Sequence, residues 1–357
     1  MNDGGGSQNA RYAHTRRTVL RLALGTGISL GFLWLAFRGV DWAGAWAVIR
    51  HARWGMAGLA LGSVILSTWM RALRWRLLFY PDHRRLDPTR CLGIFLAGQV
   101  LNAVIPARLG EIARAYLIGR YSGISKMYAL WTTVVEKVLD ALTLLLFLAG
   151  LSLFVPLPPW LQRAGRTLGL ALIAGSLLLA LLLVLRRHVL DRLQGLERAH
   201  PWIARLRLRA LLGAIGDSVR LLRNPRLAGA VGGWSVAAFG VGAWTNWLVA
   251  RALDMPLSYG AALLLLAVLQ ISAIVPIPTS PGRIGLFHYL CILSLAIFGV
   301  ARESALSYAL VLHVIFYLPM TIGGPLALWL ETRGQQGLLA VLGGQEEQRT
   351  NSHAEGI

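Results

Sequence analysis

The chain has 357 residues, of which 56% are hydrophobic and only 14% are charged. About a quarter of the residues of a soluble domain are charged, so this composition excludes a soluble globular protein and indicates an integral membrane protein. The net charge of +19 raises the alternative of nucleic-acid binding. The basic residues lie between long apolar runs, however, so we expect no nucleic-acid partner.

Residues 1–17 contain a short Gly-, Ser- and Asn-rich stretch and predict a disordered cytoplasmic head. A single transmembrane domain is expected over residues 18–331, and residues 332–357 form a polar cytoplasmic tail. Six apolar runs approach or exceed the roughly 20 residues that span a bilayer: residues 19–37, 56–78, 127–154, 168–185, 227–250 and 305–330. They predict an all-α polytopic membrane protein with about six full spans.

Lys and Arg gather in three segments outside these runs, namely residues 11–21, 71–90 and 186–226. The positive-inside rule places such segments on the cytoplasmic side. The less basic segments, residues 38–53, 155–166 and 251–259, are then outside, and both termini are cytoplasmic. We expect the protein in a bacterial inner (cytoplasmic) membrane.

Residues 202–222, inside the third basic segment, have the pattern of a basic amphipathic helix. Such a helix lies on the inner leaflet, and a solvated linker helix is the alternative.

Two further apolar stretches are each interrupted by prolines. One covers residues 92–105 and resumes after Glu111; the other covers residues 261–275 and resumes at residues 286–300. A broken helix at membrane depth leaves backbone groups unpaired unless protein or a water-filled cavity supplies partners. We therefore predict two re-entrant, proline-broken helical hairpins that frame one cavity.

The span count requires the first hairpin to enter from the cytoplasm and the second from outside. Inverted repeats with broken helices in matching positions are how many transporters build a site. Gln99 and Pro106 in the first stretch match Gln270 and Pro276 in the second at nearly equal spacing. This match fits inverted repeats and fits chance about equally well.

The first break carries a cluster of polar and helix-breaking residues, which are Asn102, Pro106, Arg108, Gly110, Glu111 and Arg114. Arg108, Glu111 and Arg114 follow helical spacing and can share a face. The planar guanidinium of arginine suits phosphate and carboxylate. The cluster predicts a site for an anionic lipid head group, and a self-neutralising Arg and Glu pair is the alternative.

Glu136, Lys137 and Asp140 lie inside the third apolar run. At 1.5 Å per residue, Glu136 and Asp140 are roughly 13 and 20 Å into the helix, which is mid-bilayer. Because they are four residues apart they share a face, whereas Lys137 points elsewhere. They could be a proton-coupling pair, counter-ions to Arg108, Arg114 or Arg283, or a static ion-pair network.

The second break contains the residues Pro278, Pro281, Gly282, Arg283 and Gly285, followed by His288. The prolines exclude a continuous helix. An ionisable residue such as Arg283 inside a membrane indicates a functional site, and snorkelling to the outer interface is the alternative. His288 is expected to pack or hydrogen bond. We find no catalytic motif, cofactor motif or metal-ligand spacing, and we expect none of these.

Three segments in this order, NAVIPARLGEIARAY, TTVVEKVLD and PIPTSPGRIGLFH, resemble the lysylphosphatidylglycerol synthase transmembrane-region family of flippase-like membrane proteins. In this family the same fold forms the lipid-translocating part of the bacterial multiple peptide resistance factor. It is fused to a glycosyltransferase in some archaeal proteins and includes hopanoid-associated members. The resemblance implies three motifs here, with Lys137 where an Arg is commoner, Arg283 in place of a usual Gly and His288 in place of a usual Glu.

We therefore predict a lipid transporter that moves an anionic phospholipid, an isoprenoid-linked lipid or a hopanoid-type lipid between leaflets. The expected head-group residues are Asn102, Arg108, Glu111, Arg114, Glu136, Asp140 and Arg283. The expected structural breaks are Pro106, Gly110, Pro278, Pro281, Gly282 and Gly285. The alternative is a membrane-embedded transferase or a non-transporting partner of a lipid- or glycan-modifying enzyme. The chain lacks an aminoacyltransferase domain, so it should not synthesise lysyl-lipid itself.

Overall fold

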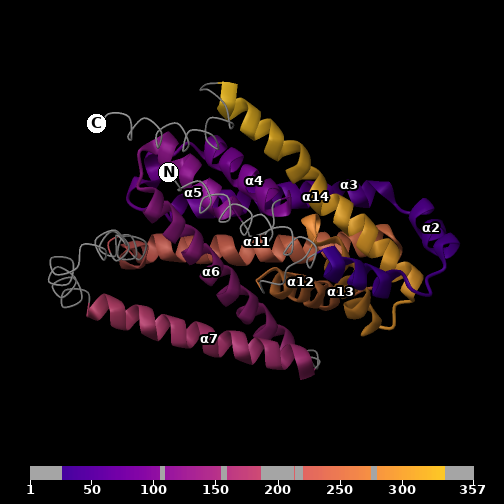
Figure 1. Cartoon of the computed structure of the whole chain (residues 1–357). Coiled ribbons are helices and arrows are strands. Elements are labelled where there is room, and N and C mark those ends of the chain that lie inside the picture. Colours follow the sequence, from indigo (N-terminus) through magenta and orange to yellow (C-terminus); the bar gives the residue numbers. More distant parts are fainter. Residues whose placement is uncertain are drawn as a thin grey trace, which may run out of the picture.

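The computed structural model describes residues 26–104, 109–153, 159–185, 213, 220–274 and 280–333. Over these residues the chain is helical and contains no strand, in agreement with the all-α prediction (Figure 1). The helices are Thr26–Phe37, α2 (Trp42–Arg50), α3 (Trp54–Leu77), α4 (Pro88–Val104), α5 (Leu109–Ser122), α6 (Lys126–Ser152), α7 (Pro159–Val184), α11 (Pro225–Ala252), α12 (Tyr259–Ile274), α13 (Ile284–Ala296) and α14 (Arg302–Arg333), with short 3-10 turns η1 (Asp82–Arg85), η2 (Arg220–Arg223) and η3 (Pro281–Arg283). The predicted head, most of the tail and nearly all of the expected amphipathic helix lie outside the described residues.

In the described part of the chain, three helices are long and apolar enough to cross a membrane: α3, α11 and residues Arg302–Ala327 of α14. The helix Thr26–Phe37 and α2 add a fourth if this pair, bent by 82°, is one span. α6 has 27 residues, but every 18-residue stretch of it includes Glu136, Lys137 and Asp140. The helices thus support a multi-pass membrane protein, and the number of six full spans stays a prediction.

α3 and α11 lie side by side and run in opposite directions. At the start of α3, the backbone N–H of Arg53 donates to the carbonyl of Ala252 at the end of α11 (2.7 Å). Near the end of α3, Arg74 donates to the hydroxyl of Ser235 in the first half of α11 (3.0 Å). This antiparallel pair forms the centre of the fold.

The order and the packing of four helices repeat along the chain. The first set is α3, α4, α5 and α6, and the second is α11, α12, α13 and α14. Contacts of α4 with α3, α5 and α14 are matched by contacts of α12 with α11, α13 and α6. The corresponding central helices, α3 and α11, are antiparallel, which is the relation that an inverted repeat requires.

Each interrupted helix pair begins and ends at the same end of the molecule. Leu86, just before α4, and Ile118, in the last turn of α5, belong to one apolar cluster. Leu257, just before α12, and Leu295, in the last turn of α13, belong to another. The first cluster lies at the C-terminal end of α3 and the second includes residues at its N-terminal end.

Connecting segments that are far apart in the sequence meet at each of these two ends. Leu78 and Leu86, from the basic segment 71–90, share the first cluster with Leu221 from the basic segment 186–226. At the other end Arg53 and Asp254, from two segments predicted to lie outside, form an ion pair (2.5 Å). Segments assigned to one side of the membrane therefore meet in the structure.

The first break is held by a close crossing of α4 and α5. A Cβ atom at Gly110 would overlap the carbonyl oxygen of Gly98 and the side chain of Asn102, so only glycine fits. The amide oxygen of Asn102 accepts a hydrogen bond from the backbone N–H of Gly110 (2.8 Å). This bond satisfies one of the N–H groups that the start of a helix leaves unpaired. Gly110 therefore allows α4 and α5 to cross closely, whereas Pro106 lies outside the described residues.

The second break contains two consecutive left-handed residues, Gly282 (φ 69°) and Arg283 (φ 53°). A non-glycine residue in this region is uncommon. The Tyr317 hydroxyl of α14 donates to the Gly282 carbonyl (2.6 Å) and holds the turn. A Cβ at Gly285 would overlap the Ser29 carbonyl of the first helix. Gly282 thus takes a left-handed conformation in this turn, and Gly285 lies at a close contact with the first helix.

Replacing Gly110 by Ala should destabilise the protein by about 1–3 kcal/mol, the usual cost of forcing extra atoms into a packed interior. The thermal unfolding midpoint in detergent measures this effect. The matched control is Gly229→Ala in α11, where a Cβ would meet no atom within 4 Å, so the midpoint should stay or rise. Equal midpoints for the two variants would contradict the crossing.

Candidate functional site

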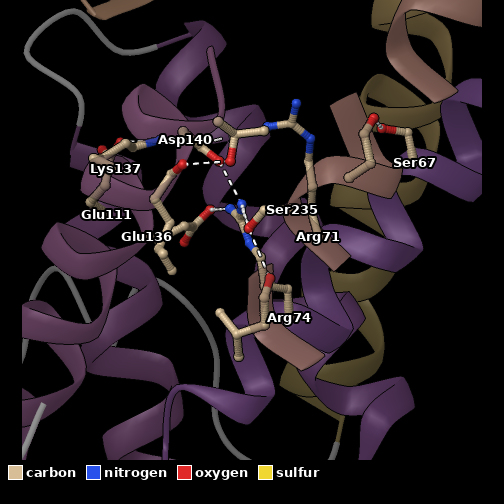
Figure 2. Close-up of polar contacts among 12 residues, drawn as sticks. Ser67, Arg71, Arg74, Glu111, Glu136, Lys137, Asp140 and Ser235 are labelled. Carbon is tan, nitrogen blue, oxygen red and sulfur yellow. Dashed lines mark hydrogen bonds and ion pairs between the residues drawn. The ribbon is translucent and has the colours of Figure 1, made fainter. Parts of the chain in front are cut away.

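Five charged side chains from α3, α5 and α6 form an ion cluster. Figure 2 labels four of them, Arg71, Arg74, Glu136 and Asp140. Arg114 Nη2 lies 2.7 Å from Glu136 Oε2. Arg74 lies between the two carboxylates of α6, with Nη1 2.7 Å from Asp140 Oδ1 and Nη2 3.7 Å from Glu136 Oε1. Arg71 Nη1 is 3.7 Å from Asp140 Oδ2. Glu136 is therefore a counter-ion to Arg114, one of the alternatives that the sequence left open, whereas Asp140 pairs with Arg71 and Arg74, which were not among the expected partners.

The burial of this cluster explains why its charges must stay together. The side chain of Arg74 is 0% exposed, and those of Glu136 and Arg114 are 2% and 4% exposed. A buried ion is costly unless an opposite charge and hydrogen bonds accompany it. Glu136 and Asp140 can lie inside an apolar helix because Arg74 reaches both.

Arg114 is also enclosed by aromatic rings. Its guanidinium carbon lies 4.1 Å from the ring centroid of Trp75 and 4.3 Å from that of Phe95. The side chain crosses directly over Gly98, where a Cβ would overlap it. Arg114 is therefore fixed in place, and its role is to hold α5 against α3, α4 and α6.

A second pair lies nearer to open space. Lys137 Nζ is 3.8 Å from Glu111 Oε1, and the two side chains are 49% and 17% exposed. Lys137 points away from the buried ion cluster and toward Glu111, as Figure 2 shows. Lys137 was predicted to point away from the face that Glu136 and Asp140 share. It nevertheless lines the cavity that Glu136 lines and the one that Asp140 lines.

Two adjoining cavities of about 220 and 350 Å³ lie between the two interrupted helix pairs. They share a polar wall made of Arg71, Gln99, Asn102, Lys137, Gln270 and Arg283. Gln99 and Asn102 come from α4, before the first break, and Gln270 comes from α12, before the second. Both broken elements thus face one space.

Arg283 reaches this wall from the second break. Its Nη2 donates to the carbonyl and to the hydroxyl of Ser272 in α12, the latter at 2.9 Å. These bonds tie the two sides of the interrupted pair together and hold the guanidinium at the cavity.

His288 lies behind the Arg283 turn and forms a hydrogen bond, as predicted. Its Nδ1 donates to the Ile284 carbonyl (2.7 Å), and its ring stacks on His313, with centroids 5.1 Å apart. His313 in turn stacks on Tyr317, with centroids 4.2 Å apart. This stack supports the Tyr317 hydroxyl that holds Gly282.

The structure brings most of the predicted site residues together around the two cavities: Asn102, Glu111, Arg114, Glu136, Asp140 and Arg283. Arg108, Pro106 and Pro278 lie outside the described residues. Among the described residues, no group of three or more His, Cys, Asp or Glu side chains is placed to hold a metal ion.

The sequence reasoning missed Arg71 and Arg74 as site residues. Both lie at the end of an apolar run and were assigned to a basic cytoplasmic segment. Their spacing of three residues gave a signal, because it puts both on one face of a helix. In the sequence Gln99 and Gln270 stand out only by their spacing to proline, and this spacing does not predict that they line the cavities.

Replacing Glu136 by Gln should lower the free energy of unfolding by about 3–5 kcal/mol, because it leaves Arg74 and Arg114 buried without a full counter-charge. Lys137→Gln is the matched control at the next residue. The ion pair of Lys137 with Glu111 is partly exposed and its charged atoms are 3.8 Å apart. The free energy of unfolding should therefore change by only about 0–1 kcal/mol. Chemical unfolding in mixed micelles measures both, and a Glu136→Gln protein as stable as the control would contradict the buried cluster.

The chain was compared with curated proteins and with models of protein families. No curated protein is similar enough to the chain to count as a match. The model of one family, described as the lysylphosphatidylglycerol synthase TM region, matches residues 22–324, which include both breaks and all of the ion cluster. The chain therefore belongs to the lysylphosphatidylglycerol synthase transmembrane-region family, as its three motifs suggested.

Proposed function

We propose that the protein moves a lipid with an anionic head group between the two leaflets of the membrane. The observation that carries this proposal is a polar, cationic cavity between two interrupted helix pairs in an otherwise apolar helical protein. The head group would pass through the cavity while the chains stay in hydrocarbon. An anionic phospholipid, an isoprenoid-linked lipid or a hopanoid-type lipid would fit this description.

The proposed architecture has six full spans and two re-entrant hairpins, α4 with α5 and α12 with α13. In this proposal each pair returns to the end from which it enters. The proposal is supported by the two outer ends of each pair, which belong to one apolar cluster. The antiparallel course of α3 and α11 supports the interpretation of inverted repeats. In transporters with this architecture the binding site lies near the midplane, where the two broken elements meet.

The cations at the cavity divide into two groups with different tasks. Arg74 and Arg114 are held by carboxylates and are 0% and 4% exposed, so they brace the helices. Arg71, Lys137 and Arg283 belong to the shared wall of the cavities. These three are the groups that a head group would meet.

The proposal assigns the protein to a bacterial inner membrane with both termini in the cytoplasm, on the basis of the basic segments. It also assigns transport and not catalysis to the protein. A transferase would show turnover of a lipid-linked donor, and divalent-metal dependence of that turnover would favour the enzyme.

The direct test is translocation in proteoliposomes. Full-length protein should speed the movement of fluorescent anionic phospholipid between leaflets, measured by dithionite quenching. Arg283→Gln should slow it about tenfold or more, since a hydrogen bond to a charged group contributes about 1.5–3 kcal/mol.

The control variant is Arg120→Gln, which changes an exposed arginine on α5 and should leave the rate unchanged. Protein that accelerates no phospholipid and no polyprenyl phosphate would contradict the proposed function. Unchanged thermal midpoints for both variants would show that slow transport does not reflect unfolding.

A further inference from the structure

Two glutamines line both cavities, one from each interrupted helix pair. Gln99 in α4 and Gln270 in α12 are both half-buried and both line the two cavities. They occupy matching places, about one turn before each break. Neither side chain forms a hydrogen bond with another residue in the described part of the chain. Because both line the cavities, their amide groups are placed to donate to a bound molecule.

Arg71 is a third side chain on the cavity wall whose N–H groups can donate to a ligand. Its distance of 3.7 Å to Asp140 exceeds that of a charge-assisted hydrogen bond, about 2.7–2.9 Å. Its guanidinium carbon lies 5.0 Å from the ring centroid of Phe239, which orients the side chain. Arg71 and Arg283 thus present guanidinium groups to the shared wall from the two halves of the molecule.

The charges around the cavities do not cancel. Among the described residues, the ion cluster and the cavity wall contain five cationic side chains and three carboxylates, a net charge of +2. They are Arg71, Arg74, Arg114, Lys137 and Arg283, with Glu111, Glu136 and Asp140. This excess of positive charge among the described residues favours an anionic ligand in the cavities.

Charge and size together select the head group. A phosphate monoester carries about −1.5 to −2 charges near neutral pH, with three acceptor oxygens, whereas the phosphodiester of a simple phospholipid carries one charge. The cavity of about 220 Å³ is below the range of roughly 300–1,000 Å³ that holds drug-sized ligands, and the cavity of about 350 Å³ is near its lower limit. A bare phosphate fits this space better than a sugar-bearing head group does.

We propose that the cavity binds the terminal phosphate monoester of a lipid, with Arg71 and Arg283 as guanidinium donors, Gln99 and Gln270 as amide donors, and Lys137 as the third cation. This inference rests on the proposed transport function and names its substrate class. Recognition comes from the dianionic phosphate, so phosphatidic acid and a polyprenyl monophosphate both qualify, and phosphatidylglycerol binds more weakly.

The test is a lipid titration of purified full-length protein, read by native mass spectrometry. The probes are phosphatidic acid and phosphatidylglycerol with identical acyl chains, a polyprenyl monophosphate, and inorganic phosphate alone. The two monoester lipids should bind at least tenfold more tightly than phosphatidylglycerol. Arg71→Gln and Arg283→Gln should each reduce this preference to threefold or less, while the exposed-surface control Arg120→Gln should retain it.

A second pair of variants keeps the test decisive if an arginine variant does not fold. Gln99→Leu and Gln270→Leu remove an amide at nearly constant volume, and they should weaken monoester binding about threefold to tenfold without lowering the thermal midpoint. Equal affinity for phosphatidic acid and phosphatidylglycerol would overturn the inference. Binding of inorganic phosphate with no binding of either monoester lipid would overturn it in favour of a soluble anion.

The outcome is separable from that of the transport assay. Protein that translocates phosphatidylglycerol but shows no preference for monoesters overturns only the substrate class. Protein that binds monoesters selectively but accelerates no lipid overturns the transport proposal and leaves the binding site in place.

Discussion

Carboxylates inside an apolar helix need cations beside them, and this requirement shapes the centre of the molecule. Glu136 and Asp140 of α6 are matched by Arg74 of α3, which reaches both, and by Arg114 of α5. Arg74 also donates to Ser235 of α11. One network therefore ties four helices together, and because each buried charge depends on the next, the helices cannot shift independently.

The network also determines where open space remains. Arg114 is fixed by Glu136, Trp75 and Phe95, so the short helix α5 stays against α4. On the opposite side, Tyr317 holds the left-handed turn at Gly282. Two interrupted helix pairs, each anchored at its own end, thus leave a cavity between them with cations on its wall.

The sequence predicts much of this fold because its strongest signals are local. Length and apolarity locate the long helices, and proline locates both breaks. Glu136 and Asp140 stand out because charges are rare inside such runs. The partners of these carboxylates do not stand out in the sequence, because Arg71 and Arg74 have the same local pattern as the basic residues that flank a membrane span. Only the antiparallel packing of α3 on α11, a long-range contact, turns them inward. The role of Gln99 and Gln270 depends likewise on two distant segments meeting at one wall.

The central claim is that a lipid head group enters the cavity between the two broken helix pairs. Photocrosslinking tests it most directly: a photoreactive side chain is placed at Gln270 on the cavity wall, and at Gly229 on the outer face of α11 as the reference. With phosphate-labelled membrane lipids, we expect labelled adducts at both positions. When the Arg283→Gln substitution is introduced as well, the yield of adducts should fall at position 270 and stay the same at position 229. Adducts at position 229 with none at position 270 would contradict the claim.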